Sequence, residues 1–153
     1  MSIHTNVDSS SRIEAVVDAV SRWSGVTVAP HRYGGREFGF GSREVGHVHY
    51  TGLVDIAFPK VLHDALVDAR WTEAHHVVPH SSWTTFRVRS DEDIERALNL
   101  LRLSYLYNAL SLSRTEEGRR ALDAVDLDAE LDRIDPPRAV RERFGALREH
   151  ARQ

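Results

Sequence analysis

The hydrophobic and polar positions along the chain follow a helical period in three segments. Residues 11–23 carry apolar side chains every three or four positions, which predicts a first helix. A second helix should begin at Pro59, because proline is favoured at the first position of a helix. A third and longer helix should span residues 91–112, where Ser90 and Asp93 have the spacing of a capping box.

Shorter segments between these helices have the composition and spacing of β-strands. The dipeptide Gly41-Ser42 separates two of them and is typical of a two-residue hairpin turn. The expected strands are residues 26–32, 35–40, 43–50, 53–58, 75–79 and 84–89. Runs of short strands beside helices predict an α+β fold: a mainly antiparallel sheet with helices packed on one face.

Three segments of different character divide the chain. Residues 1–10 are polar and are expected to be disordered, residues 11–112 form the α+β domain, and residues 113–153 form a helical C-terminal extension. Val140 and Phe144 belong to an apolar stripe on the last expected helix. This extension either packs on the domain or makes a homodimer contact.

The composition narrows the classes of function. The formal net charge of -3 predicts no nucleic-acid or anionic-membrane surface. The chain has no cysteine, which excludes disulfides, thiolate metal sites and a cysteine nucleophile. Its polar start does not resemble a signal peptide, and no apolar run is long enough to span a bilayer. We therefore expect a cytoplasmic protein.

The segment REVGHVHY carries two histidines one residue apart, at positions 47 and 49. Side chains alternate along a strand, so His47 and His49 should share one face of the sheet. A regular hairpin would place Arg36 opposite His47 and turn Glu44 to the other face. Such a segment forms the edge of a pocket, or it is a strand that carries surface or structural histidines.

Asp55 stands in an otherwise apolar strand and needs a partner if it is buried. A histidine of the HVH segment is a suitable partner, and the pair would raise the proton affinity of that histidine. His75 and His76 follow downstream, and Trp83 either covers the core or lines a pocket. The grouping of five histidines, one acid and one arginine within about fifty residues favours a site.

A motif in this region resembles a known family. The pattern E-x-x-H-x-H followed by glycine, and later W-x-x-x-H, is similar to that of the luciferase-like domain family, whose best-known members are the fungal luciferases. The resemblance covers roughly residues 11–112, and Asp55 stands where the fungal sequences have a histidine. The residues that match the motif are Glu44, His47, His49, Gly52, Trp71 and His75.

The resemblance implies an oxygenase chemistry. Fungal luciferases oxidise a hydroxypyrone with molecular oxygen and need no added organic cofactor, although a shared fold does not carry an activity with it. We therefore expect a small-molecule pocket, with the activity of a cofactor-independent oxygenase on an enol or hydroxypyrone as the first hypothesis. A histidine would be the base and Arg36 would hold the anion. The expected catalytic residues are His47, His49, Asp55 and His75, and the expected substrate-binding residues are Arg36, Glu44, His76 and Trp83.

Two alternatives stay open at this point. Imidazoles and a carboxylate are ligands of zinc and non-haem iron, so the same four residues, His47, His49, Asp55 and His75, form a candidate metal site. The protein is otherwise a non-catalytic module in which the histidines are structural and the helical extension is an interaction surface. The sequence leaves open whether the protein is an enzyme.

Overall fold

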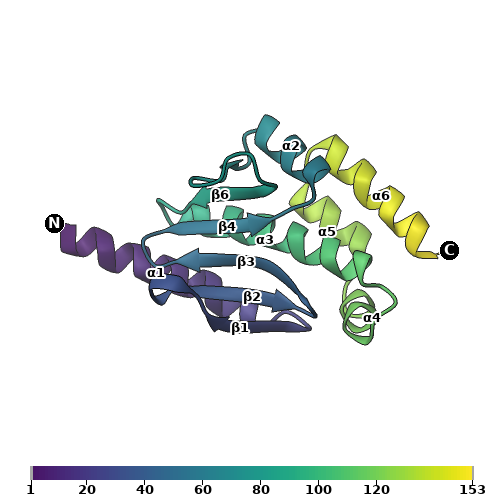
Figure 1. The fold of residues 1–153 in the computed structure, drawn as a ribbon, viewed down its shortest axis with the longest axis horizontal. Helices are drawn as coiled ribbons and strands as arrows, with labels where there is room; N and C mark the ends of the chain where they lie inside the picture. Colours follow the sequence, from purple (N-terminus) through teal and green to yellow (C-terminus); the bar gives the residue numbers. More distant parts are fainter. Residues whose placement is uncertain (1, 153) are drawn as a thin grey trace.

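Two helices, α1 (Ser2–Ser21) and α3 (Glu92–Ser111), cover one face of an antiparallel sheet in the computed structural model (Figure 1). The structure describes residues 2–152. For residues 2–8 it describes the backbone alone, and for residues 9–152 also the side chains. In this part of the chain the sheet has six strands, in the spatial order β1 (Val26–Pro30), β2 (Arg36–Phe40), β3 (Arg43–His49), β4 (Leu53–Ala57), β6 (Trp83–Arg87) and β5 (Glu73–Ala74). The predicted α+β fold is confirmed.

The core lies between the sheet and its two helices. Alternate residues of β2, β3 and β4 face α1 and α3 and are fully buried; they include Phe38, Val48 and Ile56. A side chain at Gly46 would place its Cβ 2.9 Å from Leu101 Cδ2 and 2.7 Å from a carbonyl oxygen of β4. Only glycine therefore allows α3 to cross β3 this closely.

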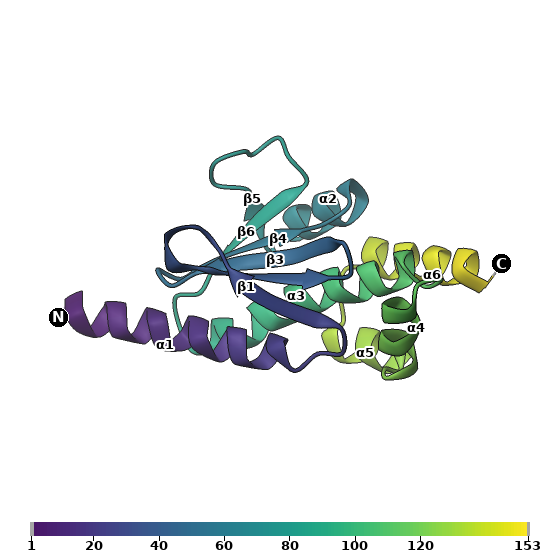
Figure 2. The ribbon, with the colours of Figure 1, turned by 60° about the horizontal axis from the view of Figure 1, so that its bottom comes forward.

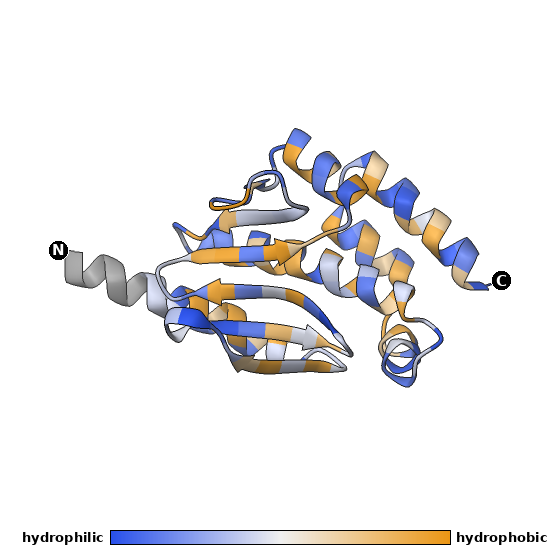
Figure 3. Ribbon diagram, viewed as in Figure 1, coloured by the Kyte–Doolittle hydropathy of each residue, from blue (hydrophilic) through white to orange (hydrophobic). Residues whose placement is uncertain are grey.

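Five further helices are present in the described residues, and all of them except η1 contribute buried residues to the core. They are η1 (Arg32–Gly34), α2 (Lys60–Asp68), α4 (Glu116–Asp123), α5 (Leu127–Ile134) and α6 (Arg138–Arg152). Apolar residues recur along β4, α3 and α6 (Figure 3), and Val140 and Phe144 of α6 are fully buried. Because α4 and α6 pack against α3, the C-terminal helices share the core. The homodimer contact stays a prediction.

Two sequence-based boundaries differ from the structure. Helix α1 begins at Ser2 rather than near residue 11; the predicted disorder falls largely on residues 1–8, whose side chains lie outside the described residues. The strand expected at residues 75–79 is wrong, since β5 ends at Ala74 and a loop follows. Local hydrogen bonds replace strand pairing in this loop, because His75 Nδ1 accepts from the amides of Val77 and Val78.

A β-bulge changes the register of the central hairpin. The turn places Phe40 opposite Arg43, as predicted, but Val45 has no partner on β2. Beyond the bulge Glu37 lies opposite His47, and the pairing expected between Arg36 and His47 is wrong. The extra residue also brings Glu44 back to the face of the two histidines, where the regular hairpin had placed it on the opposite face.

The loop of residues 75–82 rises on the face of the sheet that α1 and α3 leave free (Figure 2). Gly52 closes the turn between β3 and β4 with a φ of 111°, a conformation that favours glycine. Within residues 2–152, no helix has the length and apolar character needed to cross a membrane.

Candidate functional site

A row of polar residues crosses the sheet on the face opposite α1 and α3. The strand register pairs Glu37 of β2 with His47 of β3, His47 with Asp55 of β4, and Asp55 with Thr85 of β6. Side chains of paired residues point to the same face, so the four side chains lie next to one another. The bulge in β3 brings Glu37 into this row, because without the extra residue Glu37 would not lie opposite His47.

Asp55 is the centre of the cluster and its side chain is fully buried. Its Oδ1 accepts a hydrogen bond of 2.7 Å from the hydroxyl of Thr85. Its Oδ2 faces the Nε2 atoms of four histidines, at 3.1 Å for His47, 3.4 Å for His76, 3.5 Å for His75 and 3.6 Å for His49. The sequence-predicted residues His47, His49, Asp55 and His75 therefore converge; their catalytic role stays a prediction.

Burial and hydrogen bonding have opposite effects on the charged forms of Asp55 and His47. Burial opposes the charged form of Asp55, but hydrogen bonds from His47 and Thr85 outweigh it and hold the pKa of Asp55 well below its usual range. Burial also lowers the pKa of His47, but the bonds to Asp55 and Glu44 raise it overall to about 9. His47 is thus an imidazolium at neutral pH, with Nδ1 donating to Glu44 Oε2 at 2.7 Å.

The neighbouring imidazoles have the opposite shift. Burial lowers the pKa of His49 and the pKa of His75, and nearby imidazoles add to the effect against the attraction of Asp55. Both rings are therefore neutral at pH 7. In His75, Nδ1 accepts from two backbone amides, so the ring must carry its proton on Nε2, the nitrogen that faces Asp55.

Thr85 connects the sheet to the loop that carries His76. Its hydroxyl donates to Asp55 and accepts a 3.1 Å hydrogen bond from the backbone amide of His76. One side chain therefore fixes both the carboxylate and the start of the loop. Sequence reasoning missed Thr85, since the register that places it opposite Asp55 depends on pairing between β4 and β6, which are separated by α2 and β5.

His31 is a second residue that the sequence did not assign to the site. It follows β1, and its ring stacks on that of His47 with 4.0 Å between centroids. Its Nδ1 donates to Glu37 Oε1 at 3.3 Å. The turn that carries it includes Tyr33, with a φ of 57°. No spacing in the sequence predicts this return of the chain over the sheet.

A hollow of about 860 Å³ lies above the cluster. Its floor is the histidine and aspartate group, and apolar or aromatic side chains such as Tyr33, Leu53 and Val77 line its sides. The ring of Trp83 lies 5.1 Å from that of His47. Arg36, expected to bind substrate, instead donates to the carbonyls of Gly34 and Gly35, and among the described hydrogen bonds it makes none to a histidine.

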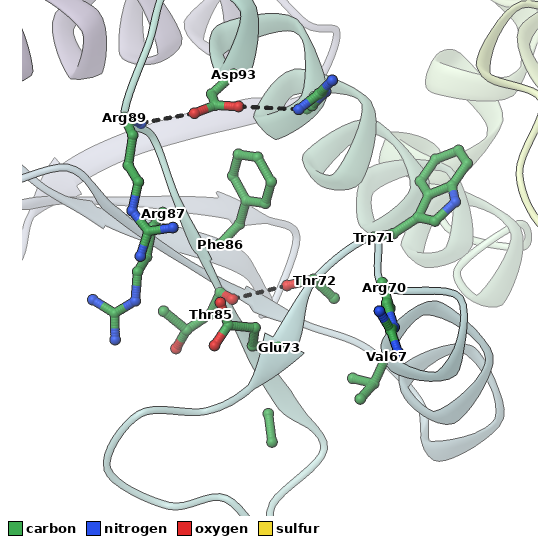
Figure 4. Close-up of a pocket in the computed structure, with 12 residues that line it drawn as sticks. Val67, Arg70, Trp71, Thr72, Glu73, Thr85, Phe86, Arg87, Arg89 and Asp93 are labelled. Atoms are coloured by element: carbon green, nitrogen blue, oxygen red, sulfur yellow. Dashed lines mark hydrogen bonds and ion pairs between the residues drawn. The ribbon is translucent and has the colours of Figure 1, made fainter.

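A second hollow, of about 520 Å³, lies near the junction of α2, β5, β6 and α3 (Figure 4). It contains Trp71, the tryptophan of the W-x-x-x-H motif, together with Arg70, Arg87 and Asp93. Thr72, just before β5, donates a 3.0 Å hydrogen bond to the carbonyl oxygen of Thr85 in β6. No histidine is among the residues that line this second hollow. The histidine-lined hollow is therefore the candidate functional site.

Nitrogen and oxygen donors suited to a metal ion meet in two adjoining groups. One contains His31, His47 and His49, and the other contains Asp55, His75 and His76; within each group the donor atoms lie within 4.8 Å of one another. His47 and Asp55, at 3.1 Å, connect the two groups. Imidazole and carboxylate together suit zinc and non-haem iron.

Comparison with known protein families agrees with the motif. Residues 42–104, less than half of the chain, match the model of the Luciferase domain. No curated protein and no solved structure was found to match the chain. The matched segment contains β3, β4, β5, β6 and most of α3, and it includes Asp55 and the four histidines around it, but not His31, Tyr33 or Glu37. The match of residues 42–104 thus supports a resemblance of this segment to the luciferase-like domain family.

Proposed function

We propose that the histidine-lined hollow binds a small planar molecule with an acidic enol hydroxyl, of the hydroxypyrone type, and promotes its reaction with molecular oxygen. The observation that carries this proposal is the polar floor of the hollow, where four histidines surround Asp55. Imidazole N–H groups are donors for an enolate oxygen. The resemblance to the luciferase-like domain family supports oxygen as the second substrate.

The shape of the hollow suits such a ligand. Apolar and aromatic side chains at its sides, among them Tyr33, Leu53 and Val77, provide contact for the faces of a planar ring. The histidine and aspartate cluster provides polar contacts for the oxygen atoms of the ligand. A ligand with one acidic edge and one apolar edge would therefore bind in a single orientation, with its oxygen atoms toward the histidines.

We assign the role of general base to His31, with Glu37 as the residue that orients its ring. Glu37 accepts from Nδ1 of His31, which orients the ring and leaves Nε2 to take a proton. Among the described residues, this Nε2 is part of no hydrogen bond. A carboxylate behind an imidazole is the usual arrangement for a general base.

The reaction balances without a further oxidant. The enol transfers its proton to His31, and the electron-rich ring carbon of the enolate gives electrons to oxygen. A carbon–oxygen bond forms, and the proton returns from His31 to the outer peroxide oxygen. The product is a hydroperoxide that contains all the atoms of the enol substrate and both atoms of oxygen, with a carbonyl in place of the enol group.

Binding and oxygen consumption test the proposal separately. We expect a simple 4-hydroxy-2-pyrone to bind, measured by calorimetry, and to consume oxygen, measured with an electrode. His31→Ala should keep binding within a few-fold and reduce oxygen consumption about 100-fold or more, the usual effect of losing a general base. His80→Ala, which changes an exposed histidine of the neighbouring loop, should leave both unchanged. Absence of binding across a set of cyclic enols overturns the proposal.

A further inference from the structure

We propose that the cluster beneath the hollow is a binding site for a divalent transition-metal ion, held by Asp55 Oδ2 and by the Nε2 atoms of His47, His49 and His76. The ion is of the class that imidazole and carboxylate ligands prefer, which includes Fe²⁺, Co²⁺ and Zn²⁺. This inference concerns the same hollow but needs only the geometry of the cluster, so it stands whether or not the hollow oxidises an enol. With an ion bound, the ion would take the place of the N–H groups of His47, His49 and His76 as the partner of an enolate oxygen.

The distances from Asp55 Oδ2 to the imidazole nitrogens match edges of a coordination polyhedron. Donors at about 2.1 Å from one ion lie roughly 3.0 Å apart in octahedral and roughly 3.4 Å apart in tetrahedral geometry. The three Nε2 atoms lie 3.1, 3.4 and 3.6 Å from Asp55 Oδ2. A charge-assisted hydrogen bond between nitrogen and a carboxylate is shorter, about 2.7–2.9 Å. The contact of His47 at 3.1 Å fits both a hydrogen bond and a shared ion, and the longer contacts of His76 and His49 fit a shared ion better.

Hydrogen bonding alone does not satisfy this arrangement. A carboxylate oxygen has two lone-pair sites, and four Nε2 atoms compete for those of Asp55 Oδ2. Asp55 is fully buried, and the side chain of His49 keeps only 21% of its surface exposed. His49 Nε2, at 3.6 Å, is too far from Asp55 Oδ2 to form a hydrogen bond with it. An ion with four or more coordination positions provides a partner for this nitrogen.

The residues behind the donors have the form of a second coordination shell. Glu44 accepts from Nδ1 of His47 at 2.7 Å, which leaves Nε2 as the ligand nitrogen. Thr85 donates to Asp55 Oδ1 and leaves Oδ2 free for the ion. Both supports come from the strand register and bulge, so the orientation of the ligands is built into the sheet.

His75 is excluded from the ligand set by its hydrogen bonds. Its Nδ1 accepts from the amides of Val77 and Val78, so its single proton lies on Nε2, and losing it would leave an imidazolate. It is a hydrogen-bond donor toward Asp55. His47 differs, because it keeps the Nδ1 proton toward Glu44 when an ion displaces the proton on Nε2. The remaining set of three imidazoles and one carboxylate occupies four positions and faces the hollow, which leaves room for a further ligand.

The neighbouring residues His75 and His76 provide a matched test. Untagged protein is treated with a chelator, and Co²⁺ is then titrated while the visible absorption of the ion and its stoichiometry are measured. We expect one Co²⁺ per chain, a higher melting temperature with the ion, and an absorption band of nitrogen-ligated cobalt. His76→Gln should weaken binding by more than about 100-fold, because a ligand is lost, and His75→Gln by only about 10-fold, because His75 supports the ligand Asp55.

His80→Gln is the control, since His80 lies exposed in the same loop. Equal binding by the protein and by His76→Gln overturns the inference, as does the lack of stoichiometric uptake. A larger loss for His75→Gln than for His76→Gln overturns the assignment of ligands. Circular dichroism of each variant establishes that the fold is kept, and His49→Ala is the second ligand variant if His76→Gln unfolds. Enol binding by protein that takes up no metal rejects this inference alone.

Discussion

Glu44 and His47 lie on the same face of the sheet, with Glu44 Oε2 2.7 Å from His47 Nδ1, although strict alternation along β3 would separate them. The bulge at Val45 is the cause, because its extra residue reverses the facing of everything before it. The same bulge places Glu37 beside His47. One extra residue in β3 therefore brings both Glu37 and Glu44 to the face of the sheet that carries His47.

Replacing Asp55 with alanine should strongly destabilise the metal-free protein. The change removes a fully buried carboxylate and leaves Thr85 and the charged His47 without their partner. Breaking a buried ion pair costs about 3–5 kcal/mol of unfolding free energy. Urea denaturation measures this cost, with the exposed Asp68→Ala as the control, expected to be within about 0.5 kcal/mol of the unchanged protein. A loss for Asp55→Ala below about 1 kcal/mol contradicts the described network.

The stability of the metal-free protein should depend on pH through His47. The pKa of His47 is raised from 6.5 to about 9 in the folded protein, so the folded state binds the proton more tightly than the unfolded chain. The resulting stabilisation is fully present below pH 6.5 and is lost as the pH rises through about 9. NMR titration of the His47 ring in chelator-treated protein gives the pKa directly.

Glu44→Gln is the companion variant for that titration. It removes the charge that hydrogen bonds to Nδ1 of His47, so the pKa of His47 should fall toward its ordinary value. The unchanged protein provides the reference. Titration of its His47 near the ordinary pKa of 6.5 would show that the described contacts with Glu44 and Asp55 do not form.

Gly46 and Gly145 should respond in opposite directions to substitution by alanine. At Gly46 a Cβ would lie 2.7 Å from the Asp55 carbonyl oxygen, and Gly46→Ala should cost about 1–3 kcal/mol by pushing β3 and β4 apart. At Gly145 in α6 nothing lies within 4 Å of a Cβ, and alanine should stabilise the helix by about 0.5–1 kcal/mol. Thermal unfolding compares the two, and a neutral Gly46→Ala would contradict the close crossing of α3.

The sequence predicted the fold well wherever one period continued without interruption. The helix at residues 91–112 and the hairpin at Gly41-Ser42 were expected and are present, because periodicity and turn chemistry are local properties. The grouping of Asp55 with the HVH histidines was also predicted, since a carboxylate among apolar residues requires a partner. These features need no knowledge of distant contacts.

The features that the sequence did not predict depend on irregular backbone or long-range contacts. The bulge reversed the expected facing of Glu44 and moved Arg36 away from the histidines. The segment after β5 contains two valines, which favour a strand, but its backbone forms a loop. His31 reaches His47 only through the turn that follows β1. None of these has a periodic pattern in the sequence.

X-ray diffraction at the cobalt absorption edge tests the central claim, that the cluster of histidines around the buried Asp55 is a functional centre, most directly. Crystals of untagged protein loaded with Co²⁺ should give one anomalous peak per chain, at about 2.0–2.2 Å from Asp55 Oδ2 and from Nε2 of His47, His49 and His76. His75 Nε2 should point to Asp55 and lie outside the coordination sphere. A peak at the exposed His80 alone, or no peak at the cluster, would contradict the claim.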